Sequence, residues 1–208
     1  MAFNYPNGHA FNGKSFKQPS VNQGVSQSKR GMSLEADINA ANNYYLATGQ
    51  AVIHKKPTPI QIVNVSYPAR SAAKITEAYF SQASTTDYNG IYKGYYIDFD
   101  AKETSHKRSF PLNNIHDHQV KHLKAIAAQH GLAFMIIRFS VLKETYVVWA
   151  DLIFQYWDNQ VTGRKSIPYE AIVKSGELIE QRISPTTPYL VAVDKLLARC
   201  ERKGDNLV

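Results

Sequence analysis

Apolar and polar residues alternate without interruption from Tyr95 to Lys102. Successive side chains of a β-strand point to opposite faces, so this pattern predicts a strand with one apolar and one polar face. The apolar face carries Tyr95, Ile97, Phe99 and Ala101. The polar face carries Tyr96, Asp98, Asp100 and Lys102. We expect the apolar face to enter a core while the two aspartates and the lysine project together.

The residues just upstream predict a second strand that folds back onto this one. Thr85 and Asp87 share a face because they stand two positions apart. Asn89-Gly90 is a favoured tight-turn dipeptide, and we place the turn of the hairpin there. A hairpin of this kind would bring Asp87 towards Asp100.

The segment from position 55 to position 84 is too long for a plain turn. It follows a short apolar strand at 51–54, and it contains a second alternating stretch at 60–65. We interpret it as a projecting hairpin that neutralises phosphates and stacks on unpaired bases; the alternative is an ordinary core hairpin. The residues that we expect to make these contacts are Lys55, Lys56, Arg70, Lys74, Tyr79 and Phe80.

Helices are predicted on both sides of these strands. Ser33 can cap the first helix, which ends near Gly49 and places Glu35 beside its apolar stripe. Asn113 or Asn114 can cap a second helix, closed by Gly131. Gln119 lies beside the apolar stripe of that helix, where its amide oxygen can face the hairpin. The two stripes comprise Leu34, Ile38, Ala41 and Tyr45, then Ile115, Val120, Leu123, Ile126 and Ala127.

The second half of the chain predicts two more strands, at 132–139 and 146–154, and a terminal helix at 188–199. The first of these strands is nearly all apolar, which is typical of a central strand. Four aromatic residues form either a dimer surface or part of the core: Trp149, Phe154, Tyr156 and Trp157. The order of elements predicts an α/β fold with a mixed central β-sheet flanked by helices.

Composition narrows the choice of partners. The 208 residues suit one domain, with residues 1–29 as a disordered basic and aromatic arm. A formal net charge of +7 and a pI near 9.3 favour nucleic acid or an anionic surface as the partner. The sequence has no run of 18 apolar residues and no signal core, so we expect neither membrane insertion nor secretion. The single Cys200 fits a reducing cytoplasm.

Carboxylates beside a lysine suit metal-assisted cleavage of a phosphodiester. Magnesium prefers hard oxygen ligands, and two carboxylates with a hydroxyl or amide oxygen make a partial cage. A lysine ammonium beside the ion can orient the attacking water or stabilise charge on the phosphorus. The alternative is a solvated strand face with weak ion pairs.

His118 and His122 have a spacing that can bind zinc, but no third ligand is evident, and we expect them and His116 to contact DNA or solvent.

The spacing from Asp87 to Asp100-Ala101-Lys102 resembles the PD-(D/E)xK nuclease motif. The wider sequence resembles the RecU family of Holliday junction resolvases from Gram-positive bacteria. This resemblance covers most of residues 29–140 and is carried by segments 29–35, 53–59, 84–90, 97–104 and 110–119. It implies a restriction-endonuclease-like nuclease domain over residues 30–208. It also implies a stalk insertion at about 55–84 that enters the centre of the junction.

The resemblance also implies a site. Magnesium, or manganese in its place, would be bound by Thr85, Asp87, Asp100 and Gln119, and Lys102 would stabilise the transition state. Related nucleases place a helical carboxylate near the metal, which makes Glu35 a further candidate. The family usually has glutamate at the position of Asp100. Aspartate is one methylene shorter, so the ion must sit closer to the strand or be reached through a water.

We therefore expect a magnesium-dependent endonuclease that resolves four-way DNA junctions by paired nicks during recombination and repair. It would act as a cytoplasmic, nucleoid-associated homodimer, with the RecA recombinase as a candidate partner. Arg30 joins the stalk residues as a candidate DNA contact. Two alternatives are a restriction-like nuclease acting on duplex or branched DNA, and a catalytically weak protein that binds junctions or modulates RecA.

Overall fold

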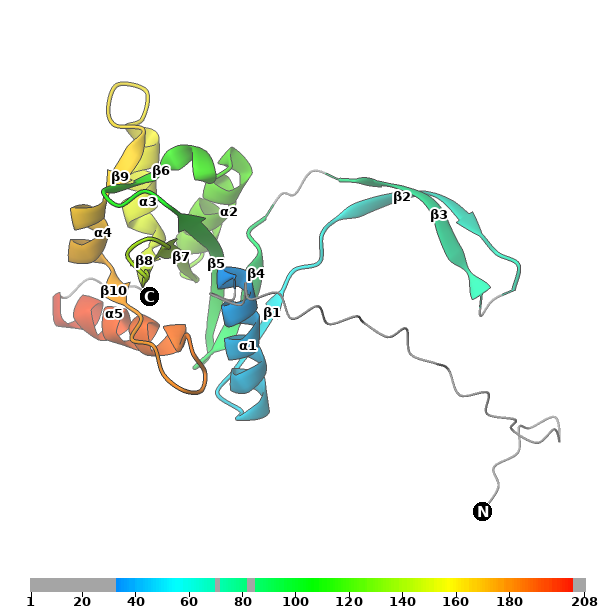
Figure 1. Cartoon of the computed structure of the whole chain (residues 1–208), viewed down its shortest axis with the longest axis horizontal. Helices are drawn as coiled ribbons and strands as arrows, with labels where there is room; N and C mark the ends of the chain where they lie inside the picture. Colours follow the sequence, from blue (N-terminus) through cyan, green and yellow to red (C-terminus); the bar gives the residue numbers. More distant parts are fainter. Residues whose placement is uncertain (1–32, 70–71, 82–84, 204–208) are drawn as a thin grey trace, which may run out of the picture. The chain divides into compact units, whose positions relative to one another are not determined.

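The computed structural model describes residues 33–69, 72–81 and 85–203 (Figure 1). The arm predicted at 1–29, Arg30 and Arg70 lie outside the described residues. The elements of the described chain are α1 (Leu34–Ala47), β1 (Ala51–Lys55), β2 (Ile60–Ser66), β3 (Lys74–Phe80), β4 (Tyr88–Tyr92), β5 (Tyr95–Thr104), β6 (Ser109–Pro111), the 3-10 helix η2 (Leu112–Asn114), α2 (Asp117–Ala128), β7 (Leu132–Phe139), β8 (Glu144–Trp149), α3 (Ala150–Asp158), β9 (Ser166–Pro168), α4 (Tyr169–Ser175), β10 (Glu177–Leu178) and α5 (Tyr189–Lys203).

Six strands form one mixed sheet in the order β1-β4-β5-β7-β8-β10. β5 and β7 are parallel, and the other neighbouring pairs are antiparallel. One apolar cluster joins α1 and α5 to Phe99 and Phe134 of the sheet, and a second joins α2, α3 and α4 to Met135 and Ile137. The predicted α/β class, a mixed sheet with helices on both faces, is confirmed (Figure 1).

β5 is the central element of the site, and its alternation is as predicted. Ile97 and Phe99 are fully buried in the cluster beneath α1 and α5. Phe99 stacks between Tyr88 and Phe134, with ring centroids 4.9 and 4.7 Å apart. The opposite face of β5 carries Asp98 and Asp100, which are also fully buried. The polar face is therefore covered at its two aspartates, and these carboxylates lie inside the protein, where each needs compensating partners.

The predicted turn at Asn89-Gly90 is wrong. Both residues lie inside β4, opposite Asp98 and Ile97 of β5. A Cβ at Gly90 would stand 2.1 Å from the carbonyl oxygen of Val52 in β1, so the glycine permits a close approach of two strands. The turn lies at Lys93-Gly94, whose φ angles of 51° and 84° suit a two-residue hairpin loop.

The strand predicted at 146–154 ends earlier, at Trp149, and α3 follows directly. Ala150 and Ile153 are buried in the second apolar cluster, a helical spacing that a continuous apolar run conceals. The four aromatic residues are partly buried and pack against the core: Trp149 against the first cluster, then Phe154, Tyr156 and Trp157 against the second.

The ends of the helices are partly as predicted. Ser33 caps α1 by accepting a hydrogen bond from the backbone N–H of Ala36 at 3.3 Å. α2 begins later than predicted, because Asn113 and Asn114 belong to η2 and His116 immediately precedes the first turn of α2. The terminal helix is confirmed, as α5. No helix within the described ranges is long and apolar enough to cross a bilayer.

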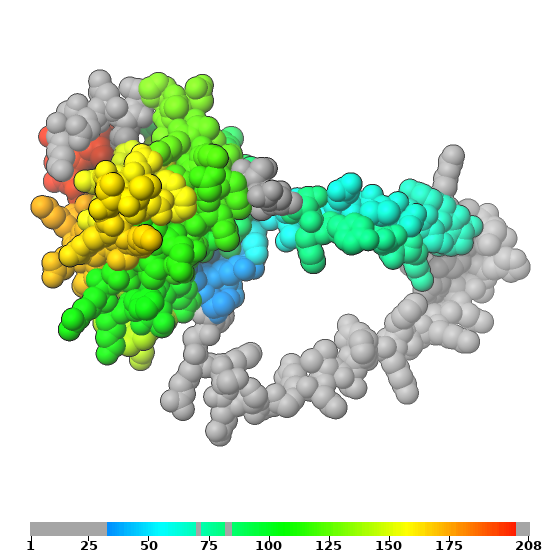
Figure 2. All heavy atoms as spheres, turned by 90° about the horizontal axis from the view of Figure 1, so that it is seen from above, coloured from blue at the N-terminus to red at the C-terminus, as the bar shows by residue number. Residues whose placement is uncertain are grey.

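β2 and β3 pair with each other in a separate two-stranded antiparallel sheet. Every residue of β3 is exposed, and Val65 is the one residue of β2 that is half-buried. In Figure 2 the pair is the narrow cyan and green segment. The predicted hairpin is confirmed, and the alternative of a core hairpin is wrong because neither face of the pair is buried.

Candidate active site

Asp100 and Lys102 form an ion pair on β5, with Lys102 Nζ 3.0 Å from Asp100 Oδ1. Burial raises the pKa of Asp100; the Lys102 ammonium opposes this effect, and the charge of Asp87 adds to it. Among the described residues, Asp100 Oδ1 has no partner in hydrogen-bond geometry. The Lys102 ammonium already lies beside this buried oxygen, and a metal ion bound there would add to the compensation that burial demands.

Asp87 and Thr85 lie in the segment that leads into β4. Tyr88 pairs with Phe99, so Asp87 immediately precedes the part of β4 that adjoins the Asp100 end of β5. Asp87 is exposed, and its charge is close enough to raise the pKa of Asp100. The two carboxylates predicted to converge are therefore neighbours. Thr85 is half-buried, and its hydroxyl donates to the carbonyl of Thr86 at 3.1 Å.

Gln119 reaches Asp100 from α2, but not in the orientation that the sequence suggested. Its amide nitrogen donates to Asp100 Oδ2, and its amide oxygen accepts from the backbone N–H of His116 at 3.0 Å. The oxygen is thus occupied at the start of α2. A metal contact through this oxygen would require the amide to turn and release the His116 N–H.

Glu35 stands at the edge of the site, in the first turn of α1. It pairs with Lys55 at 2.5 Å, and both side chains are exposed. Burial raises the pKa of Tyr88 most, followed by the charges of Glu35, Asp87 and Asp100. Those three carboxylates therefore lie near one buried tyrosine. In the described ranges, no three His, Cys, Asp or Glu side chains are placed to hold a metal, so hydroxyl, amide or backbone oxygens would have to complete a shell.

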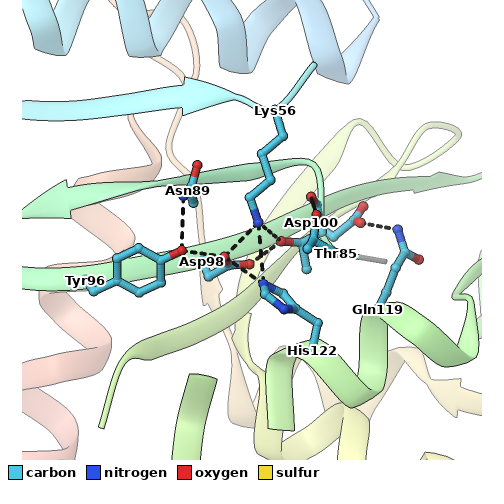
Figure 3. A network of polar contacts seen from close by, with 9 residues as sticks. Lys56, Thr85, Asn89, Tyr96, Asp98, Asp100, Gln119 and His122 are labelled. Atoms are coloured by element: carbon cyan, nitrogen blue, oxygen red, sulfur yellow. Dashed lines mark hydrogen bonds and ion pairs between the residues drawn. The ribbon is translucent and has the colours of Figure 1, made fainter. Parts of the chain in front are cut away.

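Asp98 is the hub of a polar network that the sequence did not reveal (Figure 3). Its Oδ2 lies 2.9 Å from Lys56 Nζ, 3.0 Å from His122 Nε2 and 3.0 Å from the Tyr96 hydroxyl. The Thr86 hydroxyl donates to Oδ1. Lys56 comes from the end of β1 and His122 from α2, 42 and 24 positions from Asp98. Period-two alternation could place Asp98 beside Asp100, but no local pattern could supply these distant partners.

This network bears on two further expectations. His122 was expected to contact DNA or solvent, and instead contacts a buried carboxylate. Lys56 was expected to bind DNA; its side chain is 20% exposed and pairs with Asp98, and a phosphate contact by this residue stays a prediction. The other two histidines stack on each other, with His116 and His118 ring centroids 5.4 Å apart.

The remaining candidate DNA contacts among the described residues are exposed, but some of them already have a side-chain partner. Lys55 is exposed but forms an ion pair with Glu35. Lys74, Tyr79 and Phe80 are exposed on β3, and the Tyr79 hydroxyl donates to Glu77 at 2.9 Å. A hollow of about 230 Å³ lies between the foot of this hairpin and Asp87. It is lined by Lys55, Lys56, Pro57, Thr58, Pro59, Thr85, Thr86 and Asp87.

Comparison with known proteins identifies the family. The family described as "RecU: Recombination protein U" matches residues 29–195. The chain belongs to the RecU family. Relatives named Holliday junction resolvase RecU are 55% identical in Latilactobacillus sakei and 54% identical in Leuconostoc mesenteroides. These alignments cover 96% and 95% of this chain and 98% of each relative. A relative of the same name from Oceanobacillus iheyensis is 55% identical over 200 residues.

RecU membership confirms the resemblance inferred from the motif around Asp87, Asp100 and Lys102. The family match begins before α1 and continues into α5, so it includes the hairpin as well as the six-stranded sheet. Each residue of the candidate site therefore lies inside the region that is shared with RecU proteins.

Proposed function

We propose that the protein is a Holliday junction resolvase that hydrolyses phosphodiesters of four-way DNA junctions with the help of a divalent metal. Two findings support this proposal: the similarity to relatives of that name over 96% and 95% of the chain, and one observation at the site. That observation is the buried Asp100, with an oxygen lacking a hydrogen-bond partner, beside Lys102 and next to the exposed Asp87.

The donor set fits magnesium. Asp87 and Asp100 would hold the ion, and the Thr85 hydroxyl, a Gln119 amide that has turned, or backbone oxygens would complete the shell. These are hard oxygen donors, which suit magnesium or manganese better than a soft metal. When bound, the ion supplies positive charge to the scissile phosphate. Glu35, on the rim of the site, is a candidate to orient water near that phosphate.

Lys102 has a separate role in this proposal. Its side chain is 18% exposed, so it can contact a phosphate that approaches Asp100 without leaving its ion pair. From this position it would donate to a non-bridging phosphate oxygen and stabilise the charge that develops in the transition state. The hollow beside Asp87 would accept the nucleotide next to that phosphate.

Two features would give selectivity for a junction: the hairpin formed by β2 and β3, and the two-fold symmetry of a homodimer. Lys74, Tyr79 and Phe80 are exposed on β3, where they would contact phosphates and stack on the open centre of a junction. Arg30, Arg70, Lys55 and Lys56 remain candidates for further phosphate contacts. Paired nicks require two sites, so we propose a two-fold homodimer that matches the near two-fold symmetry of the junction. The protein would also contact RecA and would be located at the nucleoid in the cytoplasm.

The test is cleavage of a mobile four-way junction, a matched duplex and a supercoiled plasmid, each with and without magnesium. Wild type and the control Asp158→Asn, an exposed carboxylate on α3, should cut the junction selectively. Asp87→Asn should bind the junction but lose on the order of 10³-fold in rate, because the metal loses a charged ligand worth several kcal/mol. Equal cutting of duplex and plasmid would favour a restriction-like nuclease. Tight junction binding without cleavage in magnesium or manganese would favour a binding protein that modulates RecA.

A further inference from the structure

Asp98 is fully buried yet has contacts with four side chains, three of which come from outside β5 (Figure 3). Thr86 occupies Oδ1, while Lys56, His122 and Tyr96 surround Oδ2. Both oxygens are therefore already used. Because both oxygens already have partners, Asp98 is poorly suited to bind an ion.

The network holds the segment that carries two candidate metal ligands. The backbone N–H of Lys56 donates to the carbonyl of Asp87 at 2.7 Å, and Lys56 Nζ contacts the Thr86 hydroxyl at 3.1 Å. Thr86 lies between Thr85 and Asp87 and is only 2% exposed. The segment 85–87 is thus fixed to β5 through Asp98, two residues from Asp100.

The same carboxylate connects β5 to α2. His122 contacts Asp98 from the helix, and Gln119, one turn earlier, donates to Asp100. In Figure 3 Lys56 approaches Asp98 from the end of β1, and His122 approaches it from α2. One buried residue therefore sets the spacing of three pieces of backbone around Asp100.

We propose that Asp98 is a positioning residue, which acts through Thr86, Lys56 and His122 to fix segment 85–87 and α2 relative to Asp100 so that a metal can bind. It does not contact the metal or the phosphate. The inference rests on the proposed nuclease function. Partners that orient metal ligands typically change metal affinity or activity by about 10- to 100-fold when they are removed.

The sharpest test is a matched pair of substitutions at Thr86. Thr86→Val keeps the size and shape of the side chain but removes the hydroxyl that donates to Asp98, whereas Thr86→Ser keeps the hydroxyl. Thr86→Val should raise the magnesium concentration for half-maximal junction cleavage about 10-fold, and Thr86→Ser should stay within about 2-fold of wild type. Junction affinity in calcium should be unchanged in both variants. At saturating magnesium, the cleavage rate of Thr86→Val should recover.

Asp98→Asn, which preserves size but removes the charge, should have the same effect. If the two residues act independently, the double variant Thr86→Val/Asp98→Asn should need about 100-fold more magnesium for half-maximal cleavage than wild type. If they act together, the double variant should need about as much magnesium as the more impaired single variant. Circular dichroism and the unfolding temperature establish that each variant is folded. If Asp98→Asn does not fold, the Thr86 pair decides the question alone.

Manganese binding, followed by the electron paramagnetic resonance signal of free Mn²⁺ without DNA, gives a readout that does not depend on cleavage. Thr86→Val and Asp98→Asn should bind manganese about 10-fold more weakly than wild type, and Asp87→Asn should bind it more weakly still. Unchanged metal requirements in folded variants would overturn the positioning role while leaving the proposed function intact. Loss of cleavage by Asp98→Asn that no magnesium concentration restores would also overturn it, because Asp98 would then act directly. A wild-type protein that neither binds manganese nor cuts junctions would overturn the function, and the inference with it.

Discussion

Replacing Asp100 with asparagine should stabilise the metal-free protein while abolishing cleavage. Burial raises the pKa of Asp100 even though Lys102 opposes the shift, so the ionised carboxylate costs free energy in the fold. Asparagine keeps the size of the side chain and can still accept from Gln119. We expect a gain of about 1 kcal/mol in the free energy of unfolding at pH 8 in EDTA. In a domain of this size, that gain raises the unfolding temperature by about 2–4 °C.

The sign of the pH dependence follows from the raised pKa. Between the ordinary value of 3.8 and the higher value in the fold, the native state binds more protons than the unfolded state. The free energy of unfolding of the wild type should therefore fall, relative to Asp100→Asn, as pH rises through that window. Above it, the full difference is present. Magnesium at ten times its Kd should stabilise the wild type alone, by about 1.4 kcal/mol, and reverse the order of the two proteins.

The assay is urea unfolding at several pH values, in EDTA and in magnesium. Asp98→Asn is the matched control. It is the same substitution on the same face of β5, but the carboxylate that it removes has hydrogen-bond partners for both oxygens. It should destabilise the protein by about 1–3 kcal/mol, since Lys56 and His122 lose their partner. The reasoning fails if Asp100→Asn is less stable than wild type at pH 8 in EDTA, or if the difference between them does not vary with pH.

Three further predictions concern activity. Lys102→Met should keep junction affinity but lower the cleavage rate by on the order of 10²-fold, and near wild-type cleavage would rule out transition-state stabilisation. Asp100→Glu should remain active and need no more magnesium than wild type, because a longer side chain can reach further towards Asp87; an inactive variant would show a site rebuilt around aspartate. Shortening 58–80 to a Gly-Ser turn should preserve the fold and lower junction affinity towards duplex affinity. With the hairpin intact, Lys74→Ala should reduce the slope of log binding constant against log salt concentration by up to about 0.9, whereas Tyr79→Ala should change this slope little. A shortened protein that still prefers junctions would show that the hairpin does not recognise the junction.

Alternation along 95–102 was sufficient to predict β5, its buried face and the shared face of Asp98, Asp100 and Lys102. This works because side-chain direction in a strand depends only on position along that strand. The motif at Asp87, Asp100 and Lys102 likewise indicated the family before any tertiary contact was known. The hairpin at 55–84 was also predictable, because its length and alternation fit no simple turn.

Local pattern failed where distant backbone decided the outcome. Asn89-Gly90 has the composition of a turn, but the glycine is needed where β4 passes close to Val52 of β1. The apolar run after Tyr146 changes from strand to helix at Ala150, and only packing against the second cluster separates the two.

The site itself required the tertiary structure. The partners of Asp98 come from the end of β1 and from α2, and the sheet order β1-β4-β5 with α2 over β5 is what brings them together. A buried charge takes its partners from whatever elements the topology places around it, whatever their separation in sequence. The sequence could therefore identify the carboxylates as candidates, whereas only the fold determined that Asp98 uses both oxygens in hydrogen bonds and that Asp100 Oδ1 pairs with Lys102 without one.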